Sequence, residues 1–192
     1  MLKEKVFDIP IVFDVFRNIM IGGKKNIHNV LIEKIGNNEK TILEIGCGTG
    51  DFAEPLKKYT GVDTNLLFIK KAQKKYPQKF FYYMDALKLD FKNNCFDKIL
   101  IMNFLHHFKD EDCFKILEEA KRVAKEEIIV LDAFIGDTIK DKWLSYLDRG
   151  DYLRTKEEQL NLIKKIFKIE DIYSFKSGLY NFMLVKCKKE EK

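Results

Sequence analysis

The stretch TILEIGCGTGDF, residues 41–52, places three glycines at alternate positions directly after an apolar run. Glycine loses more backbone freedom on folding than any other residue, so a cluster of glycines indicates positions where no side chain is tolerated. A chain that leaves a buried strand through such residues can turn sharply and let a ligand approach the main chain. The stretch predicts a strand ending at Ile45, a ligand-binding turn, and then a helix whose free N–H groups point at the ligand.

The composition is typical of a globular protein with one domain. The chain has 192 residues, of which 46% are hydrophobic and 34% are charged, and this length is sufficient to bury a core. It has no apolar run of about 18 residues that could span a membrane. The apolar N-terminal stretch is interrupted by Asp8, Pro10 and Asp14, which does not favour a signal peptide. The four cysteines form no C-x-x-C pair and are interpreted as reduced thiols, which predicts a cytoplasmic location.

The net charge of +5 is carried by lysine much more than by arginine. Arginine is the residue suited to bidentate contacts with phosphates and bases. The charge is therefore interpreted as solvated lysines on outer helix faces, and no nucleic-acid partner is predicted.

Short apolar runs rich in Ile, Val, Phe and Tyr alternate with amphipathic segments. Such runs are typical of strands buried on both faces, and the alternation predicts a parallel sheet covered by helices on both sides. The expected strands are 41–45, 60–63, 80–84, 97–102 and 127–132. The expected helices between them are 66–76, with Leu66, Ile69, Ala72 and Tyr76 on its apolar face, and 111–125, capped by Asp110.

The C-terminal part of the sequence has a different pattern. Thr155 and Glu158 form a capping-box signature that opens a helix reaching about residue 167. Two further strands are expected at 168–175 and 180–187. The short turn between them predicts a hairpin, so this edge of the sheet is expected to be antiparallel.

Two classes of nucleotide-binding turn fit a glycine-rich loop after a strand. A dinucleotide fingerprint needs G-x-G-x-x-G, but its third glycine place is Asp51, whose charge would face the pyrophosphate. The spacing here is G-x-G-x-G, preceded by Glu44. This pattern resembles the E/D-x-G-x-G-x-G motif of class I S-adenosylmethionine-dependent methyltransferases, whose cofactor carries an amino acid and a sulfonium in place of the pyrophosphate.

The resemblance covers about residues 40–135. It implies a three-layer Rossmann-like α/β methyltransferase fold, with a mostly parallel seven-stranded sheet and an antiparallel C-terminal edge, and S-adenosyl-L-methionine as the cofactor. In the family, an acid at the tip of the second strand accepts the ribose hydroxyls and an acid after the third strand accepts the adenine amino group. The residues that the resemblance places at the cofactor are Glu44, Gly46, Cys47, Gly48, Gly50, Asp63, Thr64, Asp85, Ala86 and Asn103.

Several of these residues also have a structural interpretation. Asp63 could cap the next helix, and Asp85 could cap a loop. Glu44 is expected to order the glycine loop by hydrogen bonding to it, without touching the ligand directly. Asp97 is interpreted as structural, and Cys47 as a space-filling side chain with no neighbouring group that would activate it as a nucleophile.

The segment FLHHF at 104–108 follows the fourth strand and is similar to the segment that lines the reaction centre in many small methyltransferases. A sulfonium leaves as a neutral thioether, so the main task of such an enzyme is to hold acceptor, methyl carbon and sulfur in line. A base is needed when the acceptor is a hydroxyl group. His106 and His107 are the candidates, with His107 preferred and a structural role for both left open. No acidic cluster has metal-ligand spacing, so no metal is predicted.

The segments 6–23 and 136–154 are expected to form the acceptor side of the site. The first is rich in aliphatic and aromatic residues, and the second combines aromatic residues with two of the four arginines. They predict an apolar lid with a cationic rim, suited to a small or lipid-like acceptor with an anionic group. The alternative is that both segments simply pack on the sheet. The candidate acceptor-binding residues are Phe13, Phe16, Trp143, Tyr146, Arg149 and Arg154.

One methyltransferase domain is expected over 1–192, composed of an N-terminal helical lid (1–38), the cofactor-binding core (39–135), an acceptor-side insertion (136–154), and a C-terminal helix with a β-hairpin (155–192). The expected function is methyl transfer to oxygen on a small-molecule acceptor. An RNA methyltransferase is a second hypothesis, favoured by the lysines but not by the residues after the fourth strand, which lack an N-P-P-Y or D-P-P-Y motif. A third is a non-catalytic protein that binds the cofactor and serves a partner. The oligomeric state is not indicated.

Overall fold

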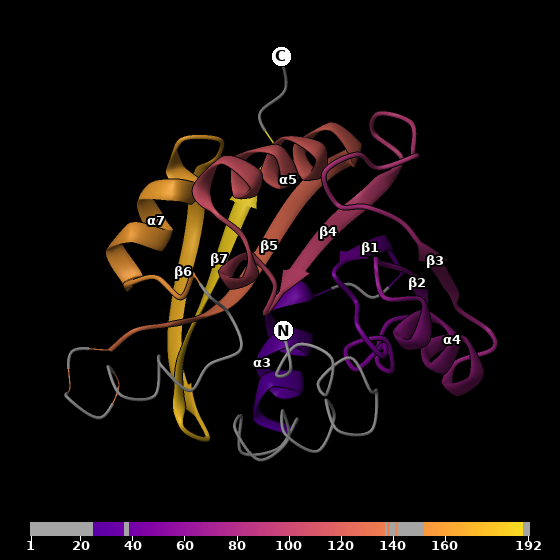
Figure 1. Ribbon diagram of the computed structural model, residues 1–192, viewed down its shortest axis with the longest axis horizontal. Coiled ribbons are helices and arrows are strands. Elements are labelled where there is room, and N and C mark those ends of the chain that lie inside the picture. The colour runs from indigo at the N-terminus through magenta and orange to yellow at the C-terminus, as the bar shows by residue number, and fades with distance from the viewer. Residues whose placement is uncertain (1–24, 37–38, 137, 139–140, 142–151, 190–192) are drawn as a thin grey trace.

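The computed structural model describes residues 25–36, 39–136, 138, 141 and 152–189. Its strands form one seven-stranded sheet in the order β3-β2-β1-β4-β5-β7-β6 (Figure 1). The strands are β1 (Thr41–Ile45), β2 (Lys58–Asp63), β3 (Phe80–Tyr83), β4 (Phe96–Met102), β5 (Ala124–Phe134), β6 (Lys168–Ser177) and β7 (Tyr180–Lys188). The helices are α3 (Lys25–Ile35), α4 (Leu66–Lys75), the 3-10 helix η1 (Leu105–His107), α5 (Asp110–Val123) and α7 (Lys156–Lys164).

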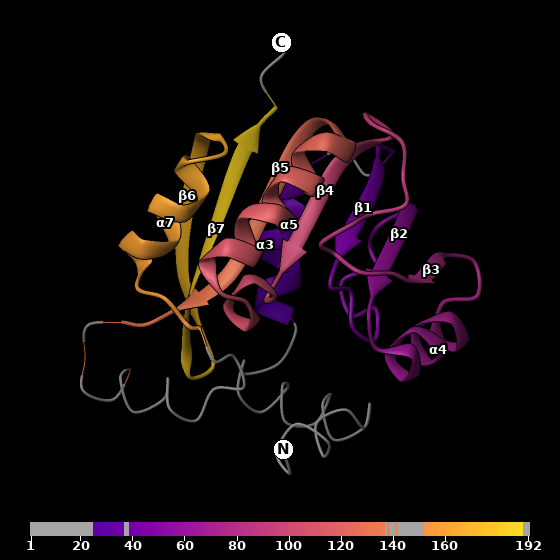
Figure 2. The same ribbon diagram turned by 45° about the horizontal axis from the view of Figure 1, so that its top comes forward.

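The strand directions confirm the mixed sheet expected from the sequence. β1 pairs in parallel with β2 and β4, and the pairs β2–β3 and β4–β5 are also parallel. β7 runs antiparallel to both of its neighbours, β5 and β6. Figure 2 shows the arrows of β4 and β7 pointing in opposite directions. The carboxyl ends of the parallel strands therefore share one edge with the start of β7.

Helices cover the sheet on both faces, which gives three layers. Alternate residues of each central strand face opposite sides: Leu100 and Ile129 pack with residues of α3 and α4, while Ile101 and Val130 pack with residues of α5 and α7. Figure 2 shows α5 in front of the sheet and α3 behind it. Strands buried on both faces explain the nearly continuous apolar runs in the sequence.

Helix α3 belongs to a core layer, although it falls within the expected lid at 1–38. Ile27, Leu31 and Ile35 recur every four residues along one face. Each is at most 1% exposed and packs in the core on the α4 side of the sheet. The other lid segment, 6–23, lies outside the described residues. None of the described helices is long and apolar enough to cross a membrane.

The strict alternation of strand and helix expected from the sequence is wrong at two connections. No helix occurs within residues 46–57 or 84–95, all of which are described. After the glycines, the N–H groups of Gly50, Ala53 and Leu56 each donate to the carbonyl three residues earlier, so successive turns take the place of the expected helix. A parallel crossover needs about a dozen residues at least, so the segment 46–57 leaves little length for a helix. Pro55 in this segment also has no N–H to donate to a helix.

The helix ends show one confirmed cap and two corrections. Thr155 and Glu158 form the expected capping box of α7. At α5, Asp110 is the first helical residue and not the cap; the cap position is Lys109, whose side chain makes no capping bond. At α4, Leu66 is 49% exposed, and Phe68 is buried in its place, four residues before the buried Ala72 on the same helix face.

Candidate active site

The glycine loop after β1 has a backbone conformation that favours glycine. Gly46, Gly48 and Gly50 have φ angles of 74°, 53° and 75°, in the left-handed region that costs other residues about 1–2 kcal/mol each. The N–H groups of Gly46 and Cys47 both donate to the carbonyl of Val62, at 2.9 and 3.0 Å. These bonds hold the loop against the end of β2. Because the loop has positive φ angles in this position, its own backbone conformation favours glycine.

At Gly46 the close neighbour is a side chain of the protein. A Cβ atom on Gly46 would lie 2.1 Å from Cδ2 of Phe104, far inside van der Waals contact. Phe104 follows β4, so its ring packs the segment after β4 against the glycine loop. The segment after β4, which the resemblance places at the reaction centre, is therefore in direct contact with the glycine loop.

Glu44 and Cys47 are buried residues that support the loop. Glu44 is 1% exposed and accepts a hydrogen bond from the hydroxyl of Tyr59 in β2. Burial, followed by the charge of Glu44, raises the pKa of Tyr59 well above its usual value, so Tyr59 keeps the proton that it donates. Burial also raises the pKa of the Cys47 thiol, which argues against a nucleophilic role. Contact of either residue with the cofactor stays a prediction.

Asp63 ends β2 and orders the glycine loop. Its Oδ2 accepts from the N–H of Gly48 at 2.9 Å and its Oδ1 from the N–H of Asn65 at 2.7 Å. The side chain of Asn65, and not that of Asp63, caps α4. A carboxylate can accept about four hydrogen bonds, so holding the loop is compatible with binding ribose hydroxyls. Thr64, beside it, is exposed.

The segment after β3 lies against the end of β2, because the N–H of Met84 donates to the carbonyl of Asp63 at 3.1 Å. Asp85 is exposed, and its Oδ1 accepts from the N–H of Leu87 at 2.9 Å. That bond supports the loop-capping interpretation, and a contact with adenine stays a prediction. Ala86 is 5% exposed and packs in the core on the α5 side.

Asn103 follows β4 with a strained backbone and an unsatisfied side chain. Its φ of 50° lies in the left-handed region, and its N–H donates to the carbonyl of Leu131 at 2.7 Å. Its amide Oδ1 is buried and has no hydrogen-bond partner. A buried acceptor without a donor costs about 1–3 kcal/mol, so this oxygen is suited to a ligand that brings an N–H or O–H group.

His106 and Asp132 form a buried pair that the sequence did not predict. Nδ1 of His106 is hydrogen-bonded to Oδ1 of Asp132, and the backbone N–H of His106 donates to Oδ2 of the same carboxylate at 3.1 Å. His106 is 8% exposed and Asp132 1%. The ring of His107 lies beside that of His106, with 4.2 Å between centroids. One feature of the sequence could have indicated this pair. Asp132 is an acid near the end of the apolar strand EIIVLD, the same placement that drew attention to Asp63.

Arg154 has partners within the protein in place of the expected anionic acceptor. Its guanidinium donates to the carboxylate of Asp110, with 2.6 Å for the shortest contact, and to the carbonyl of Phe108 at 2.8 Å. It also donates to the carbonyls of Leu105 and Tyr152, both at 3.2 Å. The side chain therefore fastens η1 and the start of α5. The other acceptor-binding candidates, Phe13, Phe16, Trp143, Tyr146 and Arg149, lie outside the described residues.

Comparisons with known proteins agree with this geometry. Residues 43–131 match a family described as a methyltransferase domain. The chain is 29% identical over 161 residues to the uncharacterized protein MJ1252 of Methanocaldococcus jannaschii, covering 81% of this chain and 62% of that protein. It is 27% identical over 139 residues to demethylmenaquinone methyltransferase of Thermotoga maritima, covering 66% and 58%. The chain thus spans less than two thirds of the length of these relatives.

The fold has many solved counterparts. One is magnesium protoporphyrin IX methyltransferase from Synechocystis PCC 6803 with bound SAH, which superposes with a TM-score of 0.72 at 19% identity and covers 92% of this chain and 87% of that one. The resemblance drawn from the glycine motif is confirmed over residues 43–131, which match the methyltransferase-domain family, and the fold is the Rossmann-like fold of solved S-adenosylmethionine-dependent methyltransferases. The cofactor of such a domain is S-adenosyl-L-methionine.

The described residues fit this cofactor. The fit rests on the unsatisfied Oδ1 of Asn103, the residue before Phe104, because the cofactor carries an amino group that can donate to it. Asp63 lies at the end of β2, where the resemblance places the ribose of the cofactor. Asn103, Asp63 and the glycine loop together would hold the cofactor along the carboxyl edge of β1, β2 and β4.

Proposed function

We propose that this protein transfers a methyl group from S-adenosylmethionine to an oxygen atom of a small-molecule acceptor. The observation that carries the proposal is the buried pair that His106, in the segment after β4, forms with Asp132, near the end of β5. The cofactor supplies an activated methyl group on a sulfonium. What remains for the chain is to position the acceptor and to remove its proton.

Asp132 assigns the proton positions on the His106 ring. A buried carboxylate next to Nδ1 favours the tautomer with a proton on that nitrogen, which leaves the lone pair on Nε2. A second hydrogen bond, from the backbone N–H of His106 to the same carboxylate, holds the backbone of His106 next to Asp132. His106 is thus oriented to take a proton at Nε2, as a histidine base held by a carboxylate does in other enzymes. This pairing supports His106 over His107 as the base.

A base is useful for a hydroxyl acceptor, because a hydroxyl must lose its proton as the new C–O bond forms. The names of two relatives, demethylmenaquinone methyltransferase and magnesium protoporphyrin IX methyltransferase, support an acceptor of small-molecule size. Arg154 does not support an anionic group on the acceptor, because its guanidinium N–H groups already donate to acceptors within the protein.

Labelling with S-adenosylmethionine that carries a deuterated methyl group tests the proposal. The protein is incubated separately with the low-molecular-mass fraction of a cell extract, with total RNA and with a total protein fraction, and the products are analysed by mass spectrometry. We expect the label in the small-molecule fraction, on an oxygen atom. Label in RNA would establish the RNA methyltransferase instead, and no label in any fraction would favour the non-catalytic protein.

A further inference from the structure

The net charge of the protein is concentrated in one segment at the β3 end of the sheet. Residues 64–83, which include α4 and β3, contain five lysines and no acidic residue. Five positive charges equal the net charge of the whole chain, so the rest of the chain is neutral overall. By contrast, α7 at the other end of the sheet combines Lys156 and Lys164 with Glu157 and Glu158 (Figure 1).

Exposed apolar side chains lie at the start of α4 and the end of β3. Leu66 and Leu67 are 49% and 54% exposed, and Tyr83 is 63% exposed. Successive residues of a strand face opposite sides of a sheet, so Tyr83 faces the same side as Phe81, which packs in the core that α4 covers. Asp63 ends β2 just before α4 and is the register partner of Tyr83. The three apolar residues therefore lie at the same end of the strands.

Lysines extend this surface along α4. Positions three, four and seven residues apart lie on one face of a helix, so Leu67, Lys70 and Lys74 share a face, and all three are exposed. The buried residues of α4 occupy the opposite face. The exposed residues that combine apolar and cationic side chains here are called the α4 surface: Leu66, Leu67, Lys70, Lys74 and Tyr83.

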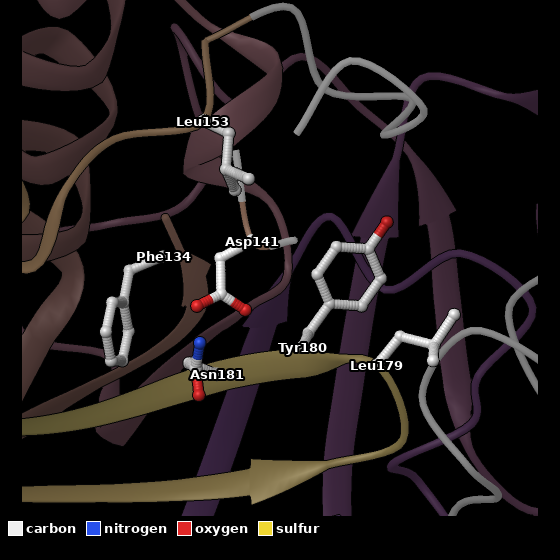
Figure 3. Close-up of a pocket in the computed structure, with 6 residues that line it drawn as sticks. All are labelled: Phe134, Asp141, Leu153, Leu179, Tyr180 and Asn181. Carbon is white, nitrogen blue, oxygen red and sulfur yellow. The ribbon is translucent and has the colours of Figure 1, made fainter. Parts of the chain in front are cut away.

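The pocket shown in Figure 3, at the end of β5 and the start of β7, is too small to be a comparable binding site. Its volume of about 10 Å³ has room for about one water molecule. Asp141, the one charged side chain among its six lining residues, already accepts hydrogen bonds from the hydroxyl and the N–H of Thr138. The α4 surface is therefore the stronger candidate for contact with an external partner.

The combination of leucine, tyrosine and lysine fits an anionic lipid surface. Lysines are attracted to negative headgroups, while exposed leucine and tyrosine side chains can insert at the boundary between headgroups and acyl chains. A nucleic acid fits less well, because contacts to bases and phosphates favour arginine, and residues 64–83 contain no arginine. A second copy of the chain would bring like charges face to face, which is unfavourable.

We propose that the α4 surface docks the protein on an anionic lipid membrane, and that the methyl acceptor is a molecule dissolved in that membrane. The second part rests on the proposed function. The surface adjoins the expected cofactor site, because Asp63 pairs with Tyr83 in register and its carbonyl accepts from the N–H of Met84 at 3.1 Å. Docking through the α4 surface therefore brings the carboxyl edge of the sheet toward the lipid.

Co-sedimentation of the full chain with vesicles tests the docking. We expect binding to vesicles of equimolar phosphatidylcholine and phosphatidylglycerol to be at least about tenfold tighter than binding to phosphatidylcholine alone. Replacing Lys70 and Lys74 together with glutamine should weaken binding to the anionic vesicles by about tenfold or more. Replacing Lys156 and Lys164 with glutamine is the matched control, which removes the same charge from α7 and should leave binding within about twofold.

A second variant tests the apolar contribution. Leu67→Ser combined with Tyr83→Ser keeps the lysines and should also weaken vesicle binding by about tenfold. Denaturant unfolding of each variant shows whether its fold is retained. Equal binding to both kinds of vesicle, equal losses in the α4 and α7 lysine variants, or no loss in the apolar variant would overturn the docking. Binding of total RNA through the same α4 lysines, without binding of vesicles, would assign the surface to a nucleic acid instead.

Labelling a total cell extract that contains its membranes with the deuterated cofactor tests the acceptor. We expect the label in the phase that organic solvent extracts. Label in the water-soluble phase alone would overturn the acceptor assignment. Absence of label from both phases would count against the proposed function, while the docking would still be decided by the vesicle measurements.

Discussion

Replacing Gly46 with alanine is expected to abolish measurable cofactor binding and to lower the free energy of unfolding by about 2–5 kcal/mol. About 1–2 kcal/mol comes from placing a side chain at a φ of 74°. A further 1–3 kcal/mol is typical of overpacking, since the new Cβ would lie 2.1 Å from the Phe104 ring. Denaturant unfolding measures the free energy of unfolding. Calorimetric titration with SAH, the demethylated form of the cofactor, measures the affinity of the site.

Gly36→Ala is the matched control. Gly36 has a φ of 70° but no atom within 4 Å of its Cβ position, so this variant carries the backbone strain without the clash. Its loss of stability should stay near 1–2 kcal/mol, with SAH binding unchanged. In Gly46→Ala with Phe104→Ala, the combined loss should be smaller than the sum of the single losses. Equal losses for the two glycines would contradict the contact between Gly46 and Phe104.

Replacing His106 with glutamine is expected to lower kcat by about 10²–10⁴-fold, the usual contribution of a general base. The substitution removes the proton-accepting Nε2 and leaves the cofactor-holding residues in place, so SAH affinity should stay within about twofold. The measurement uses the acceptor identified by labelling, with kcat, KM and SAH affinity determined separately.

Asp132→Asn tests the orienting role of the carboxylate. The amide has the same shape but can donate to Nδ1, which favours the wrong tautomer, so kcat should fall with KM little changed. A structural role for Asp132 would instead lower stability without this selective loss. If His107→Gln lowers kcat and His106→Gln does not, the base is His107, as the sequence alone favoured.

The features predicted correctly from the sequence are those determined by neighbouring residues. Glycines follow the strand at 41–45, and the Thr155–Glu158 capping box is contained within one helical turn. Apolar runs were enough to locate the central strands β1, β4 and β5, because strands buried on both faces carry little else. The largely exposed edge strand β6 was located from the short turn that joins it to β7.

Two of the features that were missed depend on residues far apart in the chain. His106 and Asp132 are 26 positions apart, and Arg154 and Asp110 are 44 apart. Each acid sat in a segment with a plausible local role, as a strand residue or a helix cap, and only the three-dimensional arrangement gave it another partner. The helix expected after the glycines failed for a local reason, since residues 46–57 include Pro55 and leave little length for a helix between two turns.

Calorimetric titration of the full chain with SAH, and separately with NAD, tests the central claim most directly. The account predicts that SAH binds at one site, that NAD binds far more weakly, and that Asp63→Ala loses at least about tenfold in SAH affinity, since a hydrogen bond to a charged acceptor contributes roughly 1.5–3 kcal/mol. Comparable affinity for NAD, or no binding of SAH by the unmodified chain, would contradict it.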